Sequence, residues 1–235
     1  MHKQFDKKKV SSNKSNSNLL SAQLVLETLE PEYGPFIWKS RYDPIHEMVF
    51  TILTQHTSDL NAEKAFENLM KKFGSLENVA RSNVKSIAQA INRGGLSNIK
   101  APRIKEILNL IVDKVGNLDL NFLKDMSLDD AKSFLIQLPG IGPKSAAVIL
   151  CLSLGMPAMP VDTHVFRVAK RLGLIDHKTD VNKAHSILES AIAPKDVYGF
   201  HVALITHGRN ICKAIRPLCG QCVLANYCPS SRLSI

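Results

Sequence analysis

The chain has 235 residues, enough for one or two domains, and its 45% hydrophobic and 22% charged residues are typical of a folded globular protein. This composition excludes a fully disordered or fibrous chain. The 30 Lys and Arg residues outnumber the 21 Asp and Glu residues, and the resulting net charge of +9 favours a polyanionic partner such as nucleic acid.

The hydrophobic pattern contains no segment long enough to cross a membrane. The most apolar stretch, residues 146–161, is interrupted by one glycine and two prolines. Residues 1–18 are rich in Lys, Ser and Asn and lack the apolar segment of a secretory signal, so we expect a disordered basic tail there. We therefore expect a cytoplasmic protein without membrane association, in which cysteines stay reduced.

Helical periodicity dominates the remaining sequence. Apolar residues recur at helical spacing over residues 62–73, 104–115 and 184–192, while no segment shows the alternation of a strand. Pro102 is predicted to lie in the first turn of its helix and Asn98 in the loop before it. The expected fold class is all-α.

Two breaks in the helical pattern suggest a division into domains. They lie near residues 42–44 and 155–160, where Pro and Gly interrupt helix continuity. We expect one helical domain over residues 45–156, and a second domain formed by residues 19–44 together with 157–235.

Four of the five cysteines lie near the C-terminus, in the spacing C-x6-C-x2-C-x5-C within 17 residues; they are Cys212, Cys219, Cys222 and Cys228. Four thiolates this close together in a reducing compartment usually bind a metal centre. Zinc sites usually contain two short Cys pairs, and only Cys219 and Cys222 form one, so the spacing favours a [4Fe–4S] cluster over zinc. Cys151 lies in an apolar run and is expected to be a buried hydrophobic residue.

The segment LPGIGPKSA, residues 138–146, connects two helical patterns. Its glycines, Gly140 and Gly142, permit a close approach of the backbone, and the free N–H groups of such a turn can bind phosphate without reading base sequence. Lys144 falls in the first turn of the second helix, where the helix dipole disfavours the charged ammonium; nucleophilic attack requires the neutral amine. The alternative is a surface lysine that only contacts phosphate.

The segment VDTHVFRV, residues 161–168, places Asp162 at the N-cap of the next helix. Capping hydrogen bonds keep the carboxylate ionised. The same carboxylate is suited to stabilise a positively charged sugar as a base leaves, or to help deprotonate Lys144. Capping alone is the simpler interpretation, and one residue can serve both purposes.

The chain resembles the endonuclease III branch of the helix-hairpin-helix DNA glycosylases over about residues 20–229. Three motifs carry the resemblance by their order and spacing: LPGIGPKSA, VDTHVFRV, and HGRNIC with the cysteines that follow it. The resemblance implies a two-lobed all-α fold: a six-helix barrel with the hairpin, and a lobe that holds a [4Fe–4S] cluster. It implies that Lys144 attacks C1′ of a damaged nucleoside in double-stranded DNA and cleaves the strand through a Schiff base and β-elimination. Asp162 would assist, the four cysteines would hold the cluster, and His207 would support the cluster lobe.

Two further segments match the same family less closely. The segment ILTQHTSD, residues 52–59, aligns with the family segment whose side chain fills the space left by a flipped-out base. The aligned residue in this chain is His56, with Gln55 beside it. In GGLSNIKA, residues 94–101, Leu96 takes the place of a leucine wedge, and the tyrosine common at the next position is serine. Ordinary surface or core packing of His56 and Leu96 is the alternative. The DNA-binding residues expected from the resemblance are Leu138, Gly140, Ile141, Gly142, Gln55, His56, Leu96 and His164.

The expected function is removal of oxidised or damaged pyrimidines, and cleavage of abasic sites, by a monomer associated with the nucleoid. A G·T or G·U mismatch glycosylase of the same fold is the first alternative, because His56 and Ser97 alter the surroundings of the base and its partner. An adenine glycosylase is disfavoured, since that branch typically lacks the nucleophilic lysine. A non-enzymatic iron–sulfur DNA-binding protein is the last alternative, although binding alone requires neither Lys144 nor Asp162.

Overall fold

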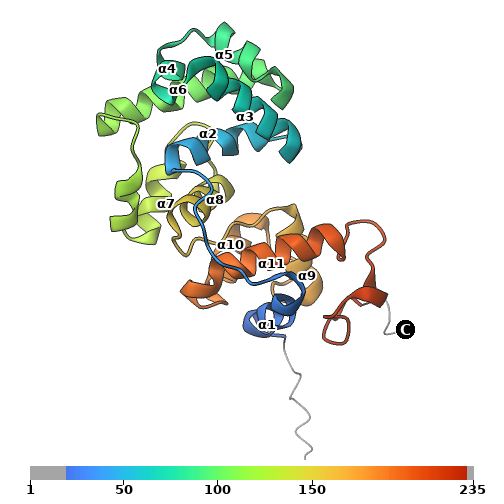
Figure 1. Ribbon diagram of the computed structural model, residues 1–235. Helices are drawn as coiled ribbons and strands as arrows, with labels where there is room; N and C mark the ends of the chain where they lie inside the picture. The colour runs from blue at the N-terminus through green and yellow to red at the C-terminus, as the bar shows by residue number, and fades with distance from the viewer. Residues whose placement is uncertain (1–19, 232–235) are drawn as a thin grey trace, which may run out of the picture.

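The computed structural model describes residues 20–231, and every regular element in that range is a helix (Figure 1). The expected all-α fold is confirmed, and the helices gather into two lobes. The basic tail expected at residues 1–18 lies outside the described residues. The upper lobe in Figure 1 contains α2 (Pro44–Thr54), α3 (Asp59–Phe73), α4 (Leu76–Arg81), α5 (Val84–Ala90), η1 (Asn92–Gly94), α6 (Ser97–Val115), η2 (Asn121–Asp125), α7 (Leu128–Ile136) and α8 (Pro143–Leu154). The lower lobe contains α1 (Ala22–Tyr33), α9 (Thr163–Leu172), α10 (Val181–Ser190), η3 (Pro194–Asp196), α11 (Val197–Asn210) and η4 (Cys219–Gln221).

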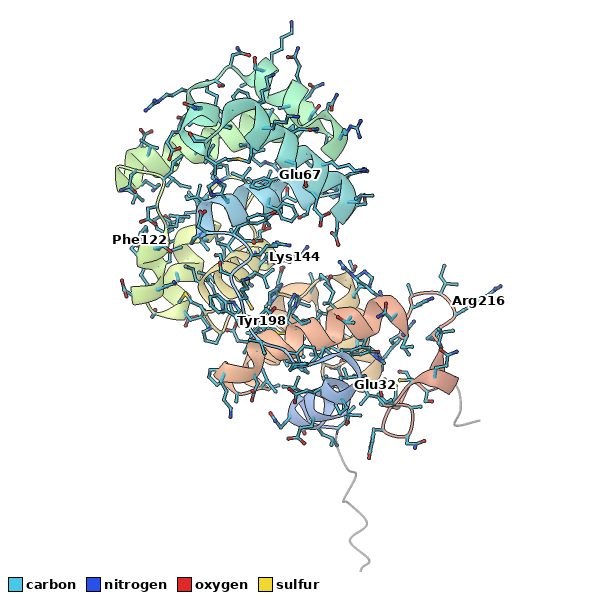
Figure 2. All side chains as sticks on the ribbon, viewed as in Figure 1. Glu32, Glu67, Phe122, Lys144, Tyr198 and Arg216 are labelled. Atoms are coloured by element: carbon cyan, nitrogen blue, oxygen red, sulfur yellow. The ribbon has the colours of Figure 1, made fainter. Side chains whose placement is uncertain are left out.

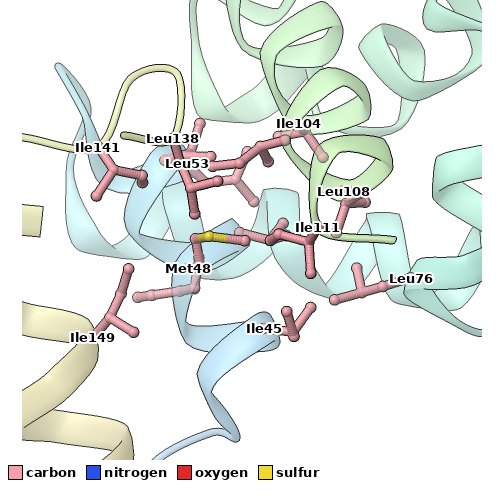
Figure 3. Packing of buried hydrophobic residues seen from close by; sticks show 14 of the residues in the cluster. Ile45, Met48, Leu53, Leu76, Ile104, Leu108, Ile111, Leu138, Ile141 and Ile149 are labelled. Atoms are coloured by element: carbon pink, nitrogen blue, oxygen red, sulfur yellow. The ribbon is translucent and has the colours of Figure 1, made fainter. Parts of the chain in front are cut away.

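The upper lobe is built around α2, which is buried along almost its whole length. A helix that is apolar nearly all round belongs in the centre of a domain. Met48 of α2 is fully buried and lies between Ile149 of α8 and Ile111 of α6 (Figure 3). The same core includes Leu138 and Ile141 of the hairpin, so the α7–α8 connection is anchored to the barrel by its apolar side chains.

The lower lobe has a hydrophobic core of its own, in which the first helix of the chain packs against the last ones. Val25 and Leu29 of α1 share this core with Val165 of α9 and Phe200 of α11. The chain thus begins in one lobe, builds the other, and returns to the first after α8 (Figure 1).

Contacts on two sides of the molecule help to hold the lobes together. The segment 34–43 leads from α1 to α2, and its Trp38 donates a hydrogen bond from Nε1 to the carbonyl of Cys151, at 2.9 Å, near the end of α8. On the other side, Lys132 of α7 forms an ion pair with Glu189 of α10. Glu189 also accepts a hydrogen bond from the Met159 amide at 2.8 Å, so it ties down the segment between α8 and α9.

The start of α6 differs from the sequence-based prediction. The helix begins at Ser97, so Asn98 is helical and Pro102 lies inside the helix rather than in its first turn. The reason is Leu96, whose left-handed backbone turns its carbonyl toward the amides of Ile99 and Lys100, both at 2.9 Å. The helix predicted through residue 192 also ends earlier, at residue 190. Among the described helices, none is both long and apolar enough to cross a bilayer.

Candidate functional site

The hairpin between α7 and α8 presents its backbone to the surface. Leu138 and Ile141 are 2% and 4% exposed, so their side chains hold the turn in the core and only their backbone can meet a ligand. Gly140 has a φ of 80°, and a Cβ there would lie 2.6 Å from Nε of Arg103, so any other residue would be strained and would require Arg103 to move. At Gly142 a Cβ would meet no atom within 4 Å, and no side chain caps the N-terminus of α8. This end of the helix is open to an anion.

A cleft of about 870 Å³ between the lobes brings the two predicted catalytic residues together. Lys144, the second residue of α8, is exposed and points toward the lower lobe (Figure 2). Asp162 lies across the cleft as the N-cap of α9, and its Oδ1 accepts a hydrogen bond from the Val165 amide at 2.7 Å. The cleft therefore holds an amine and a carboxylate fixed by the start of a helix, in a volume typical of small-molecule sites.

His201 is a cleft residue that the sequence analysis missed. It is only 6% exposed, lines the cleft, and its Nδ1 lies 3.0 Å from the carbonyl of Pro160. Burial lowers the pKa of His201 to about 4, so the imidazole is neutral at pH 7. With Nδ1–H donating to Pro160, Nε2 remains as an acceptor. The available signal was its place on α11, four residues after Val197 and three before Leu204, where it interrupts an apolar stripe.

The opening of the cleft is flanked by charged and polar side chains from both lobes. Arg209 of α11 donates a hydrogen bond to Asp59 of α3 at 2.8 Å and so connects the two walls. His164 of α9 lines the cleft as well, and its Nδ1 lies 3.2 Å from Nη2 of Arg167. His164 thus lies beside Asp162 in the lining of the cleft, and its contact with DNA stays a prediction.

The loops predicted to enter DNA are exposed and conformationally unusual. His56, between α2 and α3, is exposed with a φ of 55°, and Leu96, before α6, is 49% exposed with a φ of 50°. Leu96 is therefore not a core residue. Gln55 is engaged with the protein: its Nε2 donates to the Gly140 carbonyl at 3.1 Å, and its Oε1 accepts from Arg103 at 3.1 Å.

The four C-terminal cysteines line a single cavity between α9, α11 and the segment after α11; they are Cys212, Cys219, Cys222 and Cys228. Among the residues that the structure describes, no three His, Cys, Asp or Glu side chains are grouped so as to hold a single metal ion. Four thiolates around a shared cavity suit a cluster that bridges several irons better than one tetrahedral zinc ion. Cys151 lies elsewhere, 1% exposed, and burial raises the pKa of its thiol to about 12.

Hydrogen-bond donors surround the cysteine cavity. His207 is 1% exposed, with Nε2 3.5 Å from Sγ of Cys222 and Nδ1 3.1 Å from the hydroxyl of Tyr33. Arg171 of α9 donates to Sγ of Cys212 at 3.4 Å. Such donors orient thiolate ligands and offset their negative charge. The residues present therefore fit an iron–sulfur cluster.

Two family models match the chain. The model of the HhH-GPD superfamily base excision DNA repair protein matches residues 49–194, and that of the iron-sulfur binding domain of endonuclease III matches residues 212–228. The first covers the hairpin, Lys144 and Asp162, and the second begins and ends on cysteines of the cavity. A match to DNA repair enzymes decides against the non-enzymatic alternative.

Relatives and solved structures agree with the family models. Endonuclease III of Thermotoga maritima is 32% identical over 187 residues, which are 79% of this chain and 83% of that protein. Endonuclease III of Sulfolobus acidocaldarius is 33% identical over 180 residues, covering 76% and 78%. A trapped endonuclease III–DNA covalent intermediate matches with a TM-score of 0.75 at 25% identity, over 90% of this chain and 95% of that one. The chain therefore belongs to the HhH-GPD superfamily of base excision DNA repair proteins, as an endonuclease III-like DNA glycosylase with a C-terminal [4Fe–4S] cluster domain.

Proposed function

We propose that this protein is a bifunctional DNA glycosylase and abasic-site lyase that removes oxidised or otherwise damaged pyrimidines from duplex DNA. The observation that carries the proposal is the meeting of Lys144 and Asp162, from different lobes, in one cleft of about 870 Å³. A glycosylase must extrude its target nucleotide from the duplex, and a cleft of this size beside an exposed amine can receive it.

The chemistry follows from the groups in the cleft. Nζ of Lys144, as the free amine, attacks C1′, the N-glycosidic bond breaks, and the base leaves with the bonding electrons and takes up a proton. The carboxylate of Asp162, held by the Val165 amide, stabilises the positive charge that develops on the sugar. The sugar ring then opens to a Schiff base on Lys144, a proton leaves C2′, and the C3′–O bond breaks, which cuts the strand.

Binding to DNA is proposed to combine backbone contacts with two side chains that enter the duplex. The hairpin and the uncapped start of α8 would bind phosphate through N–H groups, and this fixes register without reading sequence. Because the Gln55 amide is already bound to the hairpin, the exposed His56 is the better candidate to fill the space of the extruded base. Leu96 would separate the neighbouring bases, and His164 would contact a phosphate.

Borohydride trapping tests the proposal on a duplex with one thymine glycol. Wild-type protein and Lys105→Ala should form a covalent adduct with the DNA, whereas Lys144→Ala should form none. Free base is measured in the same tubes. Base release without an adduct would contradict the lyase mechanism, and full strand cleavage by Lys144→Ala would contradict the assignment of the nucleophile.

The mismatch activity remains the second candidate, and the exposed His56 together with Ser97, the first residue of α6, is the observation that favours it. Single-turnover base release from thymine glycol and G·T duplexes separates the two. Faster release from the G·T duplex would replace the proposal of damaged pyrimidines. We further propose that the protein acts as a monomer on the DNA of the cytoplasm, because Lys144 and Asp162 of the same chain line one cleft and the proposed chemistry needs no second subunit.

A further inference from the structure

Lys100 of α6 is buried and forms no ion pair with a carboxylate among residues 20–231. Its side chain is 2% exposed, and Nζ donates hydrogen bonds to the carbonyls of Leu53, at 2.7 Å, and Gly94, at 2.8 Å. Desolvation lowers the pKa of Lys100. A methionine or leucine at this place would avoid the desolvation penalty of the ammonium but would leave both carbonyls without this donor, so the lysine is explained by the two segments that it binds.

The two carbonyls that Lys100 binds belong to the two loops that are proposed to enter DNA. Leu53 lies in the last turn of α2, three residues before His56, and Gly94 ends η1, two residues before Leu96. His56 and Leu96 both have a positive φ, a conformation that L-residues rarely adopt and that persists only where the surroundings enforce it. The ammonium group of Lys100 therefore binds both strained loops at the residues where each loop leaves its helix.

Arg103, one turn further along α6, extends this arrangement to the hairpin. Its Nη1 donates to Oε1 of Gln55 at 3.1 Å, and Nε2 of Gln55 donates to the carbonyl of Gly140 at 3.1 Å. Through Lys100 and Arg103, α6 is thus bonded to both loops and, by way of Gln55, to the hairpin.

We propose that Lys100 is a positioning residue that couples the His56 loop and the Leu96 loop, so that the two side chains enter the duplex together when the target nucleotide is extruded. This inference rests on the proposed function. Two independent loops would each lose conformational entropy on meeting DNA, whereas loops already fastened to one buried group are pre-organised. The effect falls on extrusion of a paired base and not on the chemistry at C1′.

The test compares Lys100→Met with Lys105→Met. Lys105 is also on α6, and its Nζ also donates to a backbone carbonyl, that of Ser82 at 2.7 Å, but Ser82 lies outside the two loops. Single-turnover rates are measured on a thymine glycol duplex and on a duplex with an abasic site, where no base has to be unpaired. Lys100→Met should be at least about tenfold slower on thymine glycol, a factor that corresponds to about 1.4 kcal/mol, and within about threefold of wild type on the abasic site. Lys105→Met should match wild type on both.

A second readout follows extrusion directly. A 2-aminopurine placed opposite the lesion should become brighter when wild type or Lys105→Met binds, because the wedge unstacks it, and this rise should be lost with Lys100→Met. All proteins are assayed below the melting temperature that circular dichroism gives for each. Equal rates and equal fluorescence for the two variants would overturn the inference. An equal loss of rate by Lys100→Met on both duplexes would overturn it too, because such a loss indicates a merely structural role. Inactive wild type would contradict the proposed function, and the fluorescence would still decide the inference because extrusion precedes the chemistry.

Discussion

We expect the two hairpin glycines to respond differently to alanine substitution: the change at Gly140 should affect folding, and the change at Gly142 should affect DNA binding. At Gly140 the φ of 80° costs an L-residue about 1–2 kcal/mol. The added Cβ also displaces Arg103, 2.6 Å from its Nε, and breaks the hydrogen bond from Arg103 to Gln55, worth about 1 kcal/mol. We expect Gly140→Ala to lower the free energy of unfolding by about 2–3 kcal/mol.

Gly142→Ala is the matched control. The φ of Gly142 is −97°, and a Cβ there meets no atom within 4 Å, so the free energy of unfolding should change by no more than about 0.5 kcal/mol. The methyl group would stand in front of the uncapped start of α8, where we propose that a phosphate binds. Affinity for DNA should therefore fall by about tenfold, the equivalent of one lost hydrogen bond to a charged group.

Urea unfolding followed by circular dichroism gives the stabilities, and fluorescence anisotropy with an abasic-analogue duplex gives the affinities. The reasoning would be refuted by a Gly140→Ala protein as stable as wild type, since neither the strain nor the clash would then be real. A Gly142→Ala protein that binds DNA like wild type would show that no phosphate approaches this turn.

Three other outcomes are expected. Asp162→Asn should keep the melting temperature, because asparagine caps a helix as well as aspartate does, and should lose base release; a parallel loss of stability would contradict this separation. Burial lowers the pKa of His201 to about 4 in the folded state. As the pH falls from about 7.5 to 5, this histidine therefore binds a proton in the unfolded state but stays neutral in the folded state. Wild type should then lose about 2 kcal/mol more unfolding free energy than His201→Gln over that interval, as measured by urea titrations at both pH values. Chelation of iron should abolish the thiolate-to-iron absorbance and expose residues 212–228 to protease, while the circular dichroism of the barrel helices should not change. An unchanged cleavage pattern would argue against a structural role of the cluster.

Features that depend on neighbours in sequence could be predicted from the sequence. The apolar spacing of α3 and α6 predicts their buried faces, the N-cap preference of aspartate predicts the start of α9, and Pro143 predicts the start of α8. The clustered cysteines indicated the iron–sulfur cluster, and the family resemblance suggested roles for Lys144 and Asp162. The misplaced start of α6 shows the limit of local rules: Pro102 suggested a first turn, but the left-handed Leu96 begins the helix earlier.

Contacts between segments distant in sequence could not be predicted in this way. Gln55 binds the carbonyl of Gly140, 85 positions later, and Arg209 binds Asp59, 150 positions earlier. Neither pair leaves a local signal, because both arise from how the lobes and helices pack. The engagement of Gln55 is nevertheless the observation on which the proposed role of His56 depends.

Buried ionisable side chains other than cysteine show where such long-range contacts lie in this chain. Four are below 9% exposure in the described residues, and each pairs with a segment that is not helical or lies at a helix end: Glu47 with Arg41, Lys100 with Leu53 and Gly94, His201 with Pro160, and His207 with Cys222. A buried polar group must be satisfied, and helices already satisfy their own backbone, so its partner is expected in a connection or a loop. The apolar pattern of the sequence shows each of these residues only as a polar interruption of a stripe. The interruption indicates which residue binds a loop or connection, and only the packing of the helices shows which segment that residue binds.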